Sequence, residues 1–80
     1  MVHLKDITYE NGIIKCLYSP ENCGEYGFIE CNAKDDLILN LEQTEYDKDK
    51  QFYYMNVKNR LMDFTKDIKN IPNEYNLIIF

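Results

Sequence analysis

The residues best suited to chemistry in this sequence are one histidine and three cysteines. A histidine acts as a general base only when a nucleophile or an orienting acid lies nearby, and nothing in the sequence places one beside His3. Structural zinc takes four nitrogen or sulfur ligands in close pairs. Because Cys16, Cys23 and Cys31 form no CxxC pair, we expect no metal site and no cofactor.

The three thiols differ in their predicted surroundings. Cys16 and Cys31 fall in predicted strands, where a free cysteine packs as a small hydrophobic residue. Cys23 lies in a polar loop that contains a glycine, where a thiol could be exposed and reactive. Glu21 and Glu25 flank this thiol, and their negative charge disfavours the thiolate. An odd number of cysteines is not typical of a secreted disulfide framework, so we expect reduced thiols and a cytoplasmic location.

The segment Asp47-x-Asp49-x-Gln51 has the spacing of the first positions of a calcium-binding loop. It lacks the glycine at the sixth position, and Lys58 stands at the twelfth, where the bidentate acid belongs. We interpret these acids as a helix cap instead, because negative charge is favoured at a helix N-terminus. The sequence also contains no Gly-rich phosphate loop and no GxSxG or HExxH motif. We therefore expect a protein that is not an enzyme.

Length and charge set further limits on the class of protein. Eighty residues form a single domain, residues 1–80, and the 14% aromatic content indicates a folded core. The net charge is −5 and the basic residues are scattered, so we expect no direct binding to nucleic acid or to an anionic membrane. No unbroken apolar run approaches the roughly 20 residues of a membrane-spanning helix. The residue usage is that of an AT-rich genome and indicates a bacterial or phage source.

The clearest structural signal is Asn11-Gly12 between two β-rich runs. This dipeptide favours the type I′ turn of a two-residue hairpin, because both central residues of that turn need a positive φ. Such a turn pairs Ile7 with Cys16, and directly opposed residues share a face. The pattern therefore predicts strands over about 3–9 and 13–18 with one apolar face.

A third strand over about 26–32 and a fourth over about 36–46 follow a loop that contains proline and glycine. Alternating leucines predict that one face of the fourth strand is buried. The buried face of the third strand depends on the turn between them. A three-residue loop would align Ile29 and Cys31 with two of these leucines, whereas a four-residue loop would align Phe28 with the central leucine.

From about residue 50 to residue 69 the apolar period changes to that of a helix. Because a helix of this length is long enough to cross the sheet, it serves as a crossover, and the last strand, over about 75–80, could lie parallel to a neighbour. The predicted fold is therefore α+β, in the order β-β-β-β-α-β. The apolar stripe that faces the sheet is predicted to consist of Tyr54, Val57, Leu61, Phe64 and Ile68.

One helix covers only one face of a five-stranded sheet, so some apolar side chains have no predicted cover. Tyrosine and methionine are favoured at protein interfaces, and methionine suits adaptable surfaces. The candidate partner surface consists of the residues off the helical stripe and on the second sheet face, namely Tyr53, Met55, Met62 and Phe28. The candidate acidic patch consists of Glu42, Glu45, Asp47 and Asp49.

These surfaces lead to three functional hypotheses. The first is a small non-enzymatic interaction module that binds a protein partner or self-associates through the second sheet face or a sheet edge, most simply as a symmetric homodimer. The second is an acidic decoy that occupies the basic nucleic-acid groove of another protein, which requires acids grouped on one face. The third is a small-ligand binder with a cleft between the helix and the sheet.

Overall fold

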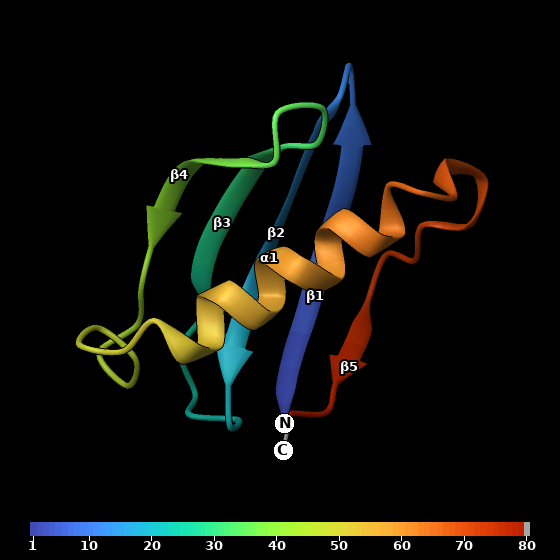
Figure 1. The fold of residues 1–80 in the computed structure, drawn as a ribbon. Coiled ribbons are helices and arrows are strands. Elements are labelled where there is room, and N and C mark those ends of the chain that lie inside the picture. Colours follow the sequence, from blue (N-terminus) through green and yellow to red (C-terminus); the bar gives the residue numbers. More distant parts are fainter. Residues whose placement is uncertain (80) are drawn as a thin grey trace.

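A computed structural model describes residues 1–79 as one antiparallel sheet of five strands with one helix, so the predicted α+β fold and its β-β-β-β-α-β order are confirmed (Figure 1). The strand order across the sheet is β4-β3-β2-β1-β5. The elements are β1 Val2–Glu10, β2 Ile13–Pro20, β3 Gly27–Asn32, β4 Leu37–Glu42, α1 Phe52–Phe64, a short 3₁₀ turn at Ile68–Asn70 and β5 Tyr75–Leu77.

Three elements are shorter than the sequence pattern predicted. Strand β4 ends at Glu42 rather than near residue 46, and β5 ends at Leu77. Phe80, which the predicted last strand included, lies outside the described residues. Helix α1 ends at Phe64 rather than near residue 69, and the Thr65 hydroxyl donates a hydrogen bond back to a carbonyl of the last turn. A threonine that bonds in this way competes with the helical ladder and favours its end.

The β1–β2 hairpin turns at Asn11 and Gly12 as predicted. Both residues have left-handed backbones, with φ of 52° and 80°, which is the geometry that a type I′ turn needs. Residues Glu10 and Ile13 are directly opposed beside the turn. The local chemistry of two residues therefore sets the register of the two longest strands.

Further from the turn, β1 contains a bulge that the sequence pattern did not predict. The pairing shifts by one residue between Lys5 and Thr8, and Asp6 has φ of 54°. The predicted pair of Ile7 with Cys16 is therefore absent from the ladder. Because the bulge adds one residue, it shifts the alternation of faces, and side chains three residues apart in β1 both reach the core.

Strand β4 contains a second bulge, and the pairing on both sides of it shows which face of strand β3 is buried. The connecting loop has four residues, but the register shifts between Glu30 and Cys31, and Leu39 has no partner in the β3 ladder. The bulge directs Ile38 and Leu41 toward the core, opposite Cys31 and Ile29. The predicted alternation of leucines is therefore wrong, and neither loop alternative describes the pairing. Phe28 stands opposite Glu42 and lies half-buried on the second face.

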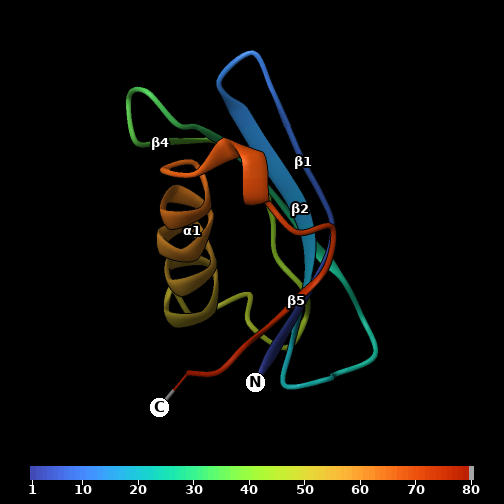
Figure 2. The same ribbon diagram turned by 90° about the vertical axis from the view of Figure 1, so that its right-hand side faces the viewer.

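Helix α1 lies diagonally across one face of the sheet, from the β4 side toward the β5 side (Figures 1 and 2). The chain then returns so that β5 runs antiparallel to β1, and the parallel arrangement considered from the sequence is not formed. The buried residues of α1 are Tyr53, Val57 and Leu61. The predicted stripe thus had the wrong starting residue: Tyr53 is a core residue, 8% exposed, and Tyr54 lies at the edge of the core.

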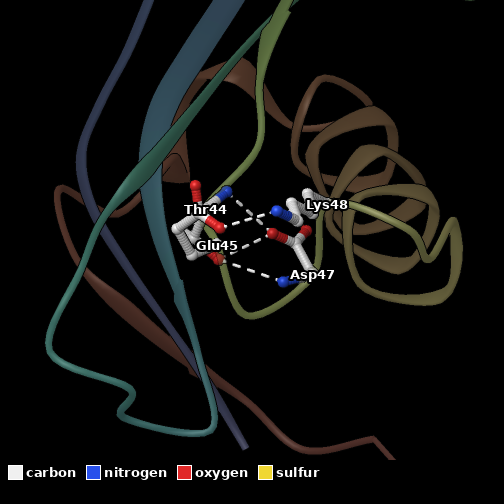
Figure 3. A network of polar contacts seen from close by, with 4 residues as sticks. All are labelled: Thr44, Glu45, Asp47 and Lys48. Atoms are coloured by element: carbon white, nitrogen blue, oxygen red, sulfur yellow. Dashed lines mark hydrogen bonds and ion pairs between the residues drawn. The ribbon is translucent and has the colours of Figure 1, made fainter.

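The connection from β4 to α1 is held by a buried carboxylate, that of Asp47 (Figure 3). Its Oδ1 accepts hydrogen bonds from the backbone N–H and the hydroxyl of Thr44, at 2.8 and 2.7 Å. Its Oδ2 accepts a hydrogen bond of 2.8 Å from the hydroxyl of Tyr18 in β2. The Gln43 amide donates to the Asp47 carbonyl at 2.7 Å. The loop is therefore tied to the middle of the sheet through one side chain.

Tyr18 reaches Asp47 because β3 has no side chain in its way. Gly27 is directly opposite Tyr18, and a Cβ at this glycine would lie 2.7 Å from the tyrosine ring and 2.6 Å from the Glu42 carbonyl oxygen. Burial, with the adjacent carboxylate, raises the pKa of Tyr18 well above its ordinary value. The phenol thus stays protonated and donates to Asp47, as a buried charge requires.

We predict that Asp47→Ala lowers the free energy of unfolding by about 3 kcal/mol, because it leaves buried donors without an acceptor. Tyr18→Phe removes one charge-assisted hydrogen bond and should cost about 2 kcal/mol. The matched control is Asp49→Ala, which removes an exposed acid from the same loop and should cost less than about 0.5 kcal/mol. Urea denaturation followed by circular dichroism measures all three, and equal costs for Asp47 and Asp49 would refute the role given to the buried carboxylate.

Candidate interaction surface

His3 lies on the second sheet face, in a cluster with three other side chains. Its Nδ1 is 2.6 Å from the Tyr26 hydroxyl, and its Nε2 is 3.5 Å from a Glu74 carboxylate oxygen. The Lys5 ammonium lies 4.0 Å from the centre of the Tyr26 ring, a cation–π distance. These contacts hold the β2–β3 loop and the start of β5 against β1. Within residues 1–79, no group of three or more His, Cys, Asp or Glu side chains is placed to hold a metal ion.

The second sheet face is only partly apolar, because charged side chains frame its central pair. Leu17 stands opposite Phe28, and this pair lies between Lys5 on one side and Glu42 on the other. Both apolar side chains are half-buried although no helix covers them. Phe28, which the sequence assigned to the candidate partner surface, is therefore half-buried between charged neighbours.

A shallow depression of about 230 Å³ lies on this second face near the β1–β2 turn. It is smaller than the roughly 300–1,000 Å³ of most ligand pockets, and it lies away from the helix. The small-ligand hypothesis placed its cleft between helix and sheet, where the described side chains form the packed core. The lining residues of the depression are Thr8, Glu10, Asn11, Ile13, Lys15 and Glu30.

The four acids of the predicted patch do not share one surface. Asp47 is fully buried, so its assignment to the patch is corrected. Glu42, Glu45 and Asp49 are exposed, and Glu45 forms an ion pair of 2.9 Å with Lys48. A decoy of phosphates needs an uninterrupted acidic surface. Here a lysine next to the central acid weakens the electrostatic match to a basic groove.

The described chain presents its most exposed apolar strand at one margin of the sheet, strand β4. Leu37 and Leu39 are 55% and 47% exposed, because Leu37 lies on the second face opposite Asn32 and Leu39 is the bulged residue without a partner in β3. Strand β4 pairs only with β3, so its other side, which we call the β4 edge, carries backbone groups that no strand pairs. Ile38 and Leu41, which both face the core, are three residues apart, and this odd spacing is the sign of a bulge in the sequence. The regular alternation of the leucines favoured an unbulged strand instead.

Further exposed apolar side chains lie in the loop after β4 and in the first turns of α1. Tyr46 and Phe52 are 43% and 50% exposed, and both rings pack edge-to-face on the buried ring of Tyr53. Met55 is 37% exposed, whereas Met62 is half-buried against the core. Of the predicted partner residues, the structure therefore leaves Met55 exposed on the solvent side and places Tyr53 inside.

Comparison of the chain with models of protein families, with curated proteins and with solved structures found no match. None of the helices in residues 1–79 is both long and apolar enough to cross a membrane. The β4 edge is therefore assigned as the candidate site from its geometry alone.

The thiols divide as the sequence predicted. Cys16 and Cys31 lie buried in the core, and burial raises the pKa of Cys16 to about 12 and that of Cys31 to about 11. Cys23 is only half-buried, in the loop, with its Sγ 3.6 Å from the Glu25 carbonyl oxygen. A nucleophilic thiol must be both accessible and ionisable, so Cys16 and Cys31 are inert in the folded chain.

We predict that a chromogenic disulfide reagent at pH 8 titrates one thiol in the native chain and three in denaturant, because only Cys23 is accessible. Cys23→Ser should abolish the native reaction and leave two thiols in denaturant. Rapid labelling of Cys16 or Cys31 in native buffer, identified by peptide mass spectrometry, would show that the core under α1 opens easily.

Proposed function

We propose that this chain is a non-enzymatic interaction module that binds an extended segment of another protein along the β4 edge. The observation that carries the proposal is a six-residue edge strand on which Leu37 and Leu39 are both about half exposed. An added strand would pair with the unpaired backbone groups of β4 and cover these leucines.

The length of the β4 edge suits this mode of binding. Six residues span about 20 Å, which matches a strand of ordinary length. Proteins protect edge strands from unwanted pairing with proline, with lysine or by shortening them. Strand β5, at the other margin, has three residues, whereas β4 contains neither proline nor lysine. Its protective features are the bulge at Leu39, which exposes an apolar side chain, and the charge of Glu42 at its end.

Other parts of the described chain favour this proposal over the alternatives. The polar second face has charged side chains around its apolar pair, and the acids are interrupted by lysine. His3 has structural partners on both ring nitrogens. The β4 edge, in contrast, gives a partner both backbone hydrogen bonds and apolar contact. A cytoplasmic location remains a prediction from the sequence.

We predict that peptides selected from a random display library for binding to this chain attach along β4. The amide signals of Leu37–Glu42 should shift in heteronuclear NMR spectra when such a peptide is added. Leu39→Lys, which places a charge on the edge, should weaken binding by about tenfold or more.

The matched control is Ile78→Lys, which puts the same charge on a residue that is 63% exposed and lies after β5. This variant should bind selected peptides as the wild type does. Selected peptides whose shifts map to the second sheet face, with equal affinity for both variants, would refute the proposal.

A further inference from the structure

Strand β4 has an unusual property for an edge strand, because its bulge makes it symmetric about its centre. Leu37 stands opposite Asn32 and Glu42 opposite Phe28, so both ends of the strand lie on the second face. Ile38 and Leu41, one residue further in at each end, both lie on the core face. Without the bulge, residues five apart would lie on opposite faces.

This symmetry matters because two identical strands can pair within one sheet only when directly opposed residues share a face. A two-fold axis perpendicular to the sheet meets that condition for β4 when Leu37 opposes Glu42 of a second copy and Ile38 opposes Leu41. The two outer residues at each end of the strand then meet this condition, and Leu39 opposes Asn40 beside the axis. We propose, on the basis of the proposed function of the β4 edge, that its occupant is a second copy of this chain.

The side chains opposed in this register are compatible on both faces. On the core face, Ile38 meets Leu41 twice, and both are half-buried residues at the margin of the hydrophobic core. Dimerisation thus joins the two cores beneath two helices on the same side of a ten-stranded sheet. On the second face no acid opposes another acid. The register that opposes Asp36 to Glu42 would bring like charges together and mismatch the faces of the strand.

The size of the contact sets the expected affinity. A stable interface buries about 1,200–2,000 Å², and one strand pair about 20 Å long covers less than that. Each copy also carries a net charge of −5, so two copies repel at low ionic strength. We therefore expect a dissociation constant of roughly 10–100 μM that decreases as salt is added. A partner and a second copy compete for the same edge.

Sedimentation equilibrium tests the dimer directly. The mass of the wild-type chain should rise from 9.6 kDa at low micromolar concentration toward twice that value at several hundred micromolar. Leu39→Lys brings two like charges close to the two-fold axis and should raise the dissociation constant at least about tenfold. The control variant Ile78→Lys should dimerise as the wild type does. Sodium chloride at 0.5 M should lower the dissociation constant of the dimer, because salt screens the repulsion between the two negatively charged copies.

Each outcome separates this inference from the proposed function. A chain that stays monomeric at several hundred micromolar overturns the dimer, while peptides that bind along β4 would still support the interaction module. A dimer that survives in Leu39→Lys but is lost in Ile78→Lys uses another surface and also overturns the inference. A β4 dimer without any peptide binding along β4 would leave the inference standing and refute the proposed function.

Discussion

The arrangement of this chain depends on one buried negative charge. Removing the Asp47 carboxylate from water is unfavourable unless hydrogen bonds compensate it, and Tyr18 and Thr44 provide them. Because Tyr18 belongs to β2 and Thr44 to the loop after β4, the compensation fixes the route of the chain from the sheet margin onto the core. Gly27 completes the arrangement by leaving room for the tyrosine ring. The start of helix α1 is therefore fixed on the β4 side of the sheet, and the helix crosses the sheet toward β5.

Two bulges allow apolar residues at irregular spacing in β1 and β4 to face one continuous core. Strand β1 brings Leu4 and Ile7 to the core although they are three residues apart, and β4 does the same for Ile38 and Leu41. In a regular strand one member of each pair would face the other way. The two bulges have different consequences, because β1 is paired on both sides and β4 on one. In β4 the bulged residue, Leu39, is left at the open edge.

The hairpin could be predicted from two neighbouring residues, whereas the buried face of α1 and the burial of Asp47 depend on contacts between residues far apart in the chain. Asn11 and Gly12 determine a turn through their own backbone preferences, so the prediction from two residues was correct. The phase of α1 was mistaken at Tyr53 because apolar residues surround the first turn on all sides, and only packing selects which one is buried. Asp47 was assigned to the surface, since its partner Tyr18 is 29 residues away in the chain.

The asymmetry between the two sheet faces supports the proposal that a partner binds at a sheet edge. The helix covers one face, and on the other the pair Leu17 and Phe28 is framed by the charged ends of Lys5 and Glu42. A partner on that face would have to desolvate these charges for a small apolar gain. At the β4 edge, by contrast, the backbone groups that lose water regain hydrogen bonds from the added strand. These costs and gains therefore favour the proposed association at the margin of the sheet over association on the uncovered face.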